Sequence, residues 1–336
     1  MTKLGIQIIP MMPAEEVIET ICAAEKLGYE YCLLCDEGFT PDVYVTLGIA
    51  ACKTTKIRLG PMTNGYTRHP AVTAIALATL NILSGGRAFV NLVAGGSMVL
   101  DPMGISRESP LVIAEETIQI MRKLWTGETI SWKGNRYSLE NAQCYLGPQK
   151  IPIWVAARGD KMLDLAGRQA DGVALMVKAD LPTAFKIVDE SAARANRHPQ
   201  RIYLDRIAYT EDLIREAAEV YGFIILDTPL RQQKILGLTS QDMKNIREAI
   251  ARGGGPEAAK LITSEMIRRY QIAGNLEECT AAVKEVIEEN KLDIFILNIT
   301  SGGLDANIRL MKDTRSIFES LKKHDVSNDI ANVVRK

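Results

Sequence analysis

The residues of this chain that could do chemistry stand where apolar segments end. They are Gln7–Pro10, Asp36 and Glu37, Met62–Asn64, Ala94–Ser97, Ala156–Asp160, Met176–Lys178 and Asn298–Gly303. No Ser-His-Asp or Cys-His set accompanies them and no G-x-S-x-G motif occurs, so the sequence does not predict catalysis by an activated nucleophile. Small residues and free backbone amides favour a site for a large planar cofactor with an anionic tail.

The segment Ala156–Asp160 has the features of a phosphate-binding turn. It contains Ala156, Ala157, Arg158 and Gly159 and leads directly into a predicted helix, whose amino-terminal N–H groups and dipole favour an anion. Arg158 could add a charge-assisted contact. An ordinary strand-to-helix turn with a glycine is an equally good interpretation of the segment alone.

Two adjacent acids, Asp36 and Glu37, follow a nearly apolar segment. A carboxyl group there could act as a general acid or hydrogen-bond a ring nitrogen, although acids at a helix start are favoured by the helix dipole alone. Asn91 lies inside a predicted strand and needs a partner, either neighbouring backbone or a ligand. For His69, which precedes Pro70, helix capping is a better interpretation than catalysis.

Cys32 and Cys35 form a C-x-x-C pair, which is typical of metal or redox sites. Both lie in a predicted strand, where residues an odd number apart point to opposite faces. We therefore expect small, buried cysteines with no shared ligand. The three histidines show no metal-binding spacing, and the sequence predicts no metal site.

These residues can form one site only if secondary-structure elements bring the segment ends together. The sequence predicts such elements, because strands alternate with helices along it. Predicted strands are 4–9, 29–35, 56–62, 87–93, 151–156, 171–177, 201–209 and 291–299, each followed by a helical segment. Eight such units predict an α/β protein with a single (β/α)8 TIM barrel, whose site lies at the carboxyl ends of the strands. An open doubly wound sheet is the alternative, but the first strand lacks a following G-x-G-x-x-G.

Three segments interrupt the alternation and predict insertions after strand four, before strand five and after strand seven. The first is the Gly/Ser/Pro-containing loop 94–109, whose length favours a functional role. The second, 127–148, predicts a hairpin around Lys133-Gly134-Asn135. The third, 210–290, is predicted to be mostly helical, with a helix boundary at the glycines 253–255.

The composition excludes several classes of protein. The 336 residues carry a net charge of −1 without a run of basic residues, which disfavours nucleic-acid binding. No apolar stretch is long enough to span a membrane, and no signal-peptide pattern precedes the first strand. We expect a cytoplasmic protein with a small-molecule substrate.

The run LGPMTNGYTRHPAVTAIALATLNILSGGRAFVNLVAGG, from Leu59 to Gly96, resembles the bacterial-luciferase-like superfamily of flavin- and deazaflavin-dependent oxidoreductases. The resemblance continues through Met103–Ile105, Glu116–Glu128 and Ile151–Val173. Within the superfamily, the pattern is most similar to the F420-dependent methylenetetrahydromethanopterin reductases. The resemblance implies a luciferase-like barrel over residues 1–325, followed by a polar tail at 326–336.

The resemblance also implies where a cofactor would lie. The ring edge is expected near Asp36, Thr63 and Asn64, with Ala94, Gly95 and Gly96 alongside. The phosphate is expected near 156–159, together with Met176 and Val177. A non-prolyl cis peptide, typical of this family, is expected at Pro61–Met62 or Met62–Thr63.

The chain departs from the reductase pattern in two places. Gln7 stands where the reductases have a glutamate, and it cannot exchange a proton near neutral pH. Glu37 follows Asp36 where the reductases favour a histidine. Asp36, Glu37 and Gln7 are therefore the candidate catalytic residues, with Glu37 able to replace the missing acid.

The resulting hypothesis is an oxidoreductase that transfers hydride between coenzyme F420 and a small organic, possibly pterin-type, substrate. The first alternative is an FMN-dependent monooxygenase or reductase, and the second is a non-catalytic flavin-binding or regulatory homologue. Arg158, Lys161 and Lys178 could bind the acidic tail of F420. An aldolase or isomerase would need a catalytic Lys, for which only Lys178 is placed. The family implies a homodimer or higher homo-oligomer.

Overall fold

The computed structural model describes residues 2–299 and 302–334 and contains a closed barrel of parallel strands. Their order around the barrel is β1-β10-β9-β8-β7-β4-β3-β2. The strands are β1 (Lys3–Ile8), β2 (Tyr31–Cys35), β3 (Arg58–Thr63), β4 (Val90–Leu92), β7 (Ile153–Ala156), β8 (Gly172–Leu175), β9 (Gln200–Asp205) and β10 (Ile294–Ile299). The predicted (β/α)8 barrel is confirmed, and the open sheet is wrong because β1 pairs with both β2 and β10.

Aromatic side chains fill the barrel interior near the amino ends of the strands. The rings of Tyr31, Phe89 and Trp154 contact one another with centroids between 4.3 and 5.8 Å apart. Aliphatic side chains such as Leu33 and Ile296 complete this inner cluster. Since this end is packed, only the carboxyl end of the barrel is free to hold a ligand.

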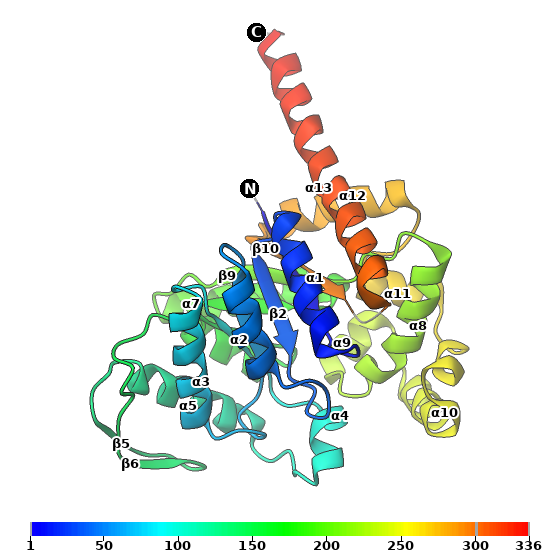
Figure 1. Ribbon diagram of the computed structural model, residues 1–336. Helices are drawn as coiled ribbons and strands as arrows, with labels where there is room; N and C mark the ends of the chain where they lie inside the picture. The colour runs from blue at the N-terminus through cyan, green and yellow to red at the C-terminus, as the bar shows by residue number, and fades with distance from the viewer. Residues whose placement is uncertain (1, 300–301, 335–336) are drawn as a thin grey trace.

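Helices surround the barrel, as Figure 1 shows. They are α1 (Ala14–Lys26), α2 (Val43–Lys53), α3 (Pro70–Leu83), α5 (Pro110–Leu124), α6 (Asp160–Gln169), α7 (Leu181–Arg194), α12 (Leu276–Asn290) and α13 (Gly303–Val334). Side chains cap the amino ends of two of these helices. Asp42 accepts from the amides of Tyr44 and Val45 at the start of α2, and the Nδ1 atom of His69 accepts from the amide of Ala71 at the start of α3. The capping role predicted for His69 is confirmed.

Two of the predicted insertions form compact additions to the barrel. The segment after β4 contains a short helix, α4 (Ser97–Leu100), followed by the 3-10 turn η1 (Asp101–Met103). The hairpin consists of β5 (Ile130–Lys133) and β6 (Ser138–Ala142). The buried carboxylate of Glu116 on α5 accepts three backbone N–H bonds from Asn135, Arg136 and Tyr137, which holds the hairpin turn against the barrel.

The third insertion is a helical unit with its own hydrophobic core. It comprises α8 (Glu211–Ile225), α9 (Leu230–Leu236), α10 (Ser240–Ala259) and α11 (Ser264–Tyr270). Its core includes Tyr221, Ile246 and Tyr270. The backbone leaves helical geometry at Gly253 and Gly254, which confirms the predicted boundary. The insertion is shorter than 210–290, because α12 packs on α7 and α13 as the crossover helix of the barrel.

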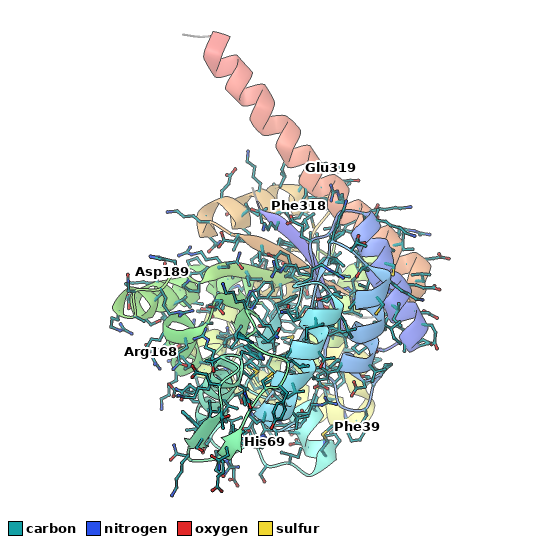
Figure 2. All side chains as sticks on the ribbon, turned by 60° about the vertical axis from the view of Figure 1, so that its left-hand side comes forward. Phe39, His69, Arg168, Asp189, Phe318 and Glu319 are labelled. Atoms are coloured by element: carbon teal, nitrogen blue, oxygen red, sulfur yellow. The ribbon has the colours of Figure 1, made fainter. Side chains whose placement is uncertain are left out.

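Figure 2 shows the two ends of the barrel: Phe39, which follows β2, lies at the carboxyl end, and Phe318 on α13 lies at the amino end. The backbone of α13 is helical through Val334, so residues 326–334 extend this helix and are not an irregular tail. Thr300 and Ser301 of the predicted segment 298–303, and Arg335 and Lys336 of the tail, lie outside the described residues. The domain boundary at 325 stays a prediction.

Three other expectations have structural outcomes. The expected cis peptide is wrong: every peptide bond in the described ranges is trans, because β3 keeps regular parallel pairing through Met62 and Thr63. All six cysteines are free thiols, and Cys32 and Cys35 are buried as predicted. Within 2–299 and 302–334, no helix is long and apolar enough to cross a membrane.

Candidate functional site

A cavity of about 720 Å³ opens at the carboxyl ends of β2, β3, β4, β7 and β8 and is covered on one side by the α8–α9 turn. Most of the predicted site residues line it: Asp36, Glu37, Asn64, Ala94, Gly95, Gly96, Ala156, Ala157, Arg158, Gly159 and Met176. Gln7, Thr63 and Val177 do not. The strand ends therefore meet as expected, and the three exceptions are buried outside the cavity lining.

Asp36 is the best-positioned polar group of the cavity. Because Cys35 pairs with Met62, the residues that follow are neighbours, and the Thr63 hydroxyl donates to Asp36 Oδ2 at 2.8 Å. Burial raises the pKa of Asp36, while the Thr63 hydrogen bond and the charge of Arg68 lower it part of the way back. Thr63 is fully buried, so it orients Asp36 without facing the cavity.

Glu37 extends the acidic wall. It lines the cavity, and burial and the neighbouring Asp36 both raise its pKa. A carboxyl group with a raised pKa keeps its proton to higher pH, as a general acid requires. Glu37 lines the cavity and has a raised pKa, so it is a candidate proton donor.

Gln7 lies behind Met62 and is buried. Its Nε2 contacts Met62 Sδ at 3.2 Å and Cys35 Sγ at 3.0 Å. Since a thioether sulfur only accepts, Met62 fixes the orientation of the amide. Gln7 therefore supports Met62 in the cavity floor, and its position favours a structural role over proton transfer.

Asn64 and the glycines after β4 line the cavity beside the acids, at the ends of the next two strands. Asn64 Oδ1 accepts from the amides of Tyr66 and Thr67, which leaves only its Nδ2 for a ligand. Gly95 has φ +77, a conformation that side chains disfavour. A Cβ at Gly96 would meet nothing within 4 Å, so this backbone borders open space.

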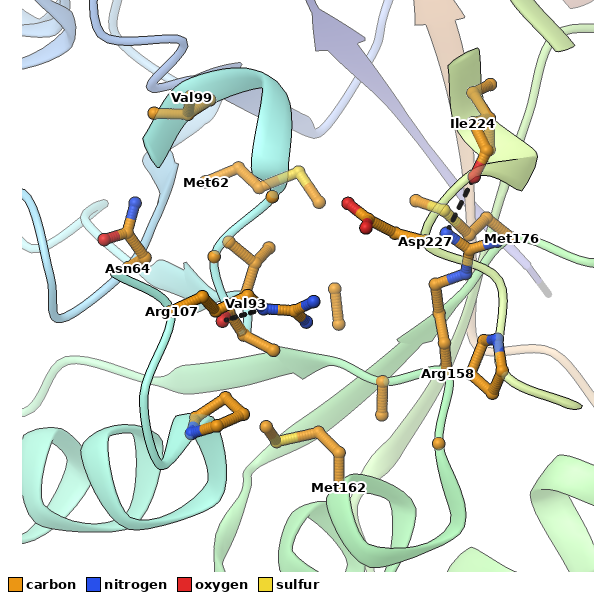
Figure 3. A pocket seen from close by; sticks show the side chains of 18 of the residues that line it. Met62, Asn64, Val93, Val99, Arg107, Arg158, Met162, Met176, Ile224 and Asp227 are labelled. Atoms are coloured by element: carbon orange, nitrogen blue, oxygen red, sulfur yellow. Dashed lines mark hydrogen bonds between the residues drawn. The ribbon is translucent and has the colours of Figure 1, made fainter. Parts of the chain in front are cut away.

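The predicted phosphate turn has the expected backbone and an unexpected arginine. Gly159 is the N-cap of α6, and no side chain caps this helix in the described structure. The Arg158 guanidinium points to the helical insertion, where it donates to the Ile224 carbonyl at 3.1 Å (Figure 3). It also donates to Gln232 Oε1 and to the Thr228 hydroxyl. Its donors hold the insertion, so a phosphate would contact backbone amides first.

Val177 and Arg231 show how the insertion is fixed on the barrel. Val177 is buried in the core of the insertion, which explains its absence from the cavity wall. Arg231 donates to Asp160 Oδ1 at 2.6 Å and to the Arg158 carbonyl, and forms an ion pair with the buried Asp180. The start of α9, which carries Arg231, therefore has a defined position over the cavity.

Three charged residues near the site were missed by the sequence analysis. Arg107, on the loop after β4, and Asp227, between α8 and α9, both line the cavity. Asp205 ends β9 and is buried. It accepts hydrogen bonds from the Tyr203 hydroxyl and the Ile272 amide, and burial raises its pKa to about 7. Only Asp205 had a signal, an acid inside the predicted strand 201–209.

No group of three or more potential ligands is placed to hold a metal ion within the described part of the chain. Lys178 does not line the cavity, whereas Lys161 does. The cavity therefore combines one acidic wall, a glycine-rich wall and a helix start. These features suit a site for a large organic molecule and place carboxyl groups beside it.

Comparison with known proteins places this geometry in context. The model of the luciferase-like monooxygenase family matches residues 2–291. A 5,10-methylenetetrahydromethanopterin reductase of Archaeoglobus fulgidus is 33% identical over 299 residues, covering 84% of this chain and 90% of the relative.

Solved structures with the same fold include enzymes that use coenzyme F420. The coenzyme F420-dependent tetrahydromethanopterin reductase of Methanopyrus kandleri superposes with a TM-score of 0.82 at 26% identity, covering 92% of this chain and 96% of that one. An F420-dependent secondary alcohol dehydrogenase, in complex with an F420–acetone adduct, shares the fold with a TM-score of 0.75 at 20% identity over 93% of this chain and 97% of that one.

Proposed function

The chain belongs to the luciferase-like monooxygenase family, and on this premise we propose that it transfers hydride between coenzyme F420 and a small organic substrate. The observation that carries the proposal is the large cavity at the carboxyl ends of the strands, which is lined by the acids Asp36 and Glu37 and by the small residues Ala94–Gly96. Its relatives of known activity include F420-dependent reductases.

The residues present fit a flavin-type group. The cavity volume lies within the range of about 300–1,000 Å³ that is usual for cofactor sites. Open space beside Gly96 leaves room for a ring, and the uncapped start of α6 offers amides to a phosphate. Ala156, Ala157 and Met176 supply an apolar surface between these two regions.

The bound cofactor would supply the hydride, and the protein would manage the proton and the orientation of the reactants. Glu37 donates a proton to the substrate, since burial keeps its carboxyl group protonated to higher pH. Thr63 fixes the direction of Asp36, which would hold one edge of the ring when the cofactor is bound. The α8–α9 turn of the insertion covers one side of the cavity.

The substrate wall comes from the insertion. Phe223, Ile224 and Leu230 line the cavity from the α8–α9 region, opposite the acids. A flat, partly apolar molecule of the pterin type suits this wall, and the reductase relatives act on such a substrate. The replacement of a strand-one acid by Gln7 assigns the proton to Glu37 in this chain.

Titration of the purified protein with F420 and with FMN tests the cofactor. Quenching of the fluorescence of oxidised F420 on binding is the expected result, and in a separate assay reduced F420 should transfer hydride to methylenetetrahydromethanopterin and be oxidised to F420. Binding of FMN alone would favour the flavin-dependent alternative and contradict the F420 proposal. Binding of neither would favour a non-catalytic homologue.

We also propose a homo-oligomer that acts in the cytoplasm. Six large apolar side chains are exposed on the adjacent helices α2 and α3, namely Val45, Ile49, Val72, Ile75, Ile82 and Leu83. Helices that are apolar on their outer faces usually pack against another surface. We call this set the α2–α3 patch, and a second copy of the chain is the partner that the family suggests.

A further inference from the structure

Four basic residues line the cavity: Arg107, Arg158, Lys161 and Arg231. Two of them are engaged in holding the insertion. Arg158 donates to three oxygen atoms of the segment 224–232, and Arg231 binds two carboxylates and a carbonyl. A guanidinium with its donors satisfied in this way has little left for a ligand.

Arg107 is placed differently. It comes from the loop after β4, is exposed to solvent, and projects its guanidinium into the cavity near Val93 (Figure 3). Its Nε donates to the Ala94 carbonyl at 3.3 Å, which anchors the group beside the glycine-rich wall. That bond uses one of its five donors and leaves both terminal nitrogens directed at the cavity.

Asp227 introduces an opposing charge on the same cavity. Ser97 donates to Asp227 Oδ2 through its amide at 3.1 Å and its hydroxyl at 2.9 Å. This contact joins the insertion to the β4 loop and directs the carboxylate into the cavity, as Figure 3 shows. Both Asp227 and Arg107 act electrostatically on Arg158, so the three charges share one region.

We propose that Arg107 binds the anionic tail of the cofactor and that Asp227 opposes this binding, so that the two residues together set the selectivity for a cofactor with an acidic tail. The inference rests on the proposed function, because F420 provides that tail. An arginine can bind a phosphate or carboxylate through two donors, whereas a nearby carboxylate repels the same group.

Two substitutions with opposite effects follow from the geometry. Arg107→Gln removes the cation, and we expect it to weaken F420 binding about tenfold, the usual scale of one charge-assisted hydrogen bond. Asp227→Asn preserves an oxygen acceptor for Ser97 and removes the negative charge, so F420 should bind more tightly. Both shifts in the F420 dissociation constant should become smaller at roughly 1 M salt, where the Debye length is about 3 Å.

The test compares two ligands with the same ring. Fluorescence titration gives the dissociation constants of F420 and of the deazaflavin riboside that lacks the phosphate and acidic tail. Arg107→Gln should change only the F420 constant, and Arg107→Lys should restore part of the binding. Arg136→Gln removes an exposed arginine outside the cavity and is the matched control for net charge.

Opposite shifts for F420 in the two variants, with an unchanged riboside constant, support the inference. Equal loss of both ligands in Arg107→Gln would assign Arg107 to the ring or to folding and overturn it. An unchanged F420 constant in Arg107→Gln would also overturn it, while leaving the proposed function intact. Failure of the wild-type protein to bind either deazaflavin would overturn the proposed function and this inference together.

Discussion

The hydroxyl of Thr63 donates a 2.8 Å hydrogen bond to Oδ2 of Asp36, which joins the end of β3 to the end of β2. Thr63 is fully buried, whereas Asp36 faces the cavity. Register explains the contact, since Cys35 and Met62, the residues before them, are paired. The orientation of a cavity acid is thus set by a residue that a ligand does not touch.

Removing this hydroxyl should change the titration of Asp36. A hydrogen bond to the carboxylate stabilises the ionised form, so Thr63→Val should raise the pKa of Asp36 above its wild-type value. Carbon-13 NMR of the Asp36 carboxyl group measures this directly. Thr63→Ser keeps the donor and serves as the control; identical titrations of the Val and Ser variants would contradict the assignment.

Glu37→Gln should separate catalysis from binding. The variant loses the proposed proton donor, so hydride transfer should slow by about a hundredfold or more while the dissociation constant of F420 stays within about twofold. In the wild type, activity should fall as pH rises through the raised pKa of Glu37, and the variant should lack this fall.

Glu108→Gln provides the control for this experiment, because Glu108 is an exposed acid outside the cavity. It should retain wild-type rates. A Glu37→Gln enzyme with unaltered rate and pH profile would show that the proton comes from another group.

Asp205 makes stability depend on pH in an unusual direction. Its pKa is about 7 in the folded protein and about 3.9 in an unfolded chain. At pH values between these two, the unfolded chain has lost the proton while the folded protein still holds it. Wild-type stability should therefore fall relative to Asp205→Asn as pH rises from about 4 to about 7, by up to roughly 1.4 kcal/mol per pH unit, and then level off.

Urea unfolding of both proteins across this range checks the prediction. The difference in unfolding free energy is the quantity to follow. If it stays constant with pH, Asp205 titrates alike in the folded and unfolded states.

The α2–α3 patch should carry the contact between copies. Val72→Lys with Ile75→Glu places two charges on its exposed face, and we expect a shift to monomer in sedimentation equilibrium. Leu261→Lys alters an exposed apolar residue of the insertion and should leave the assembly unchanged. A wild-type protein that is already monomeric would refute the proposed interface.

The elements that form the barrel could be predicted because their patterns are local. α3 runs from Pro70 to Leu83, since its helical spacing lies between His69, which caps it, and the Ser84-Gly85-Gly86 turn. β4 is shorter than expected: Val90–Leu92 are paired as a strand, and Ala88 forms an isolated bridge with Leu59. Strand ends depend on partners that the sequence does not identify.

The direction of individual side chains could not be predicted. Arg158 was expected to face a phosphate, but Gln232 and Thr228, more than 60 residues later in the chain, accept its hydrogen bonds. Thr63 was expected beside the ring and lies behind Asp36, since side chains alternate along β3. Arg107 and Asp227 come from segments without periodicity, where nothing local marks a cavity residue.

The helical insertion has its own hydrophobic core, and side-chain bridges such as Arg158 to the Ile224 carbonyl and Arg231 to Asp160 join it to the barrel. Mutations within that core can accumulate without disturbing the packing of the barrel strands. The cavity residues that the insertion supplies can therefore change during evolution while the cavity residues at the barrel strand ends stay the same. A chimera that exchanges residues 211–270 and retains these bridges would be a rational starting point for new substrates.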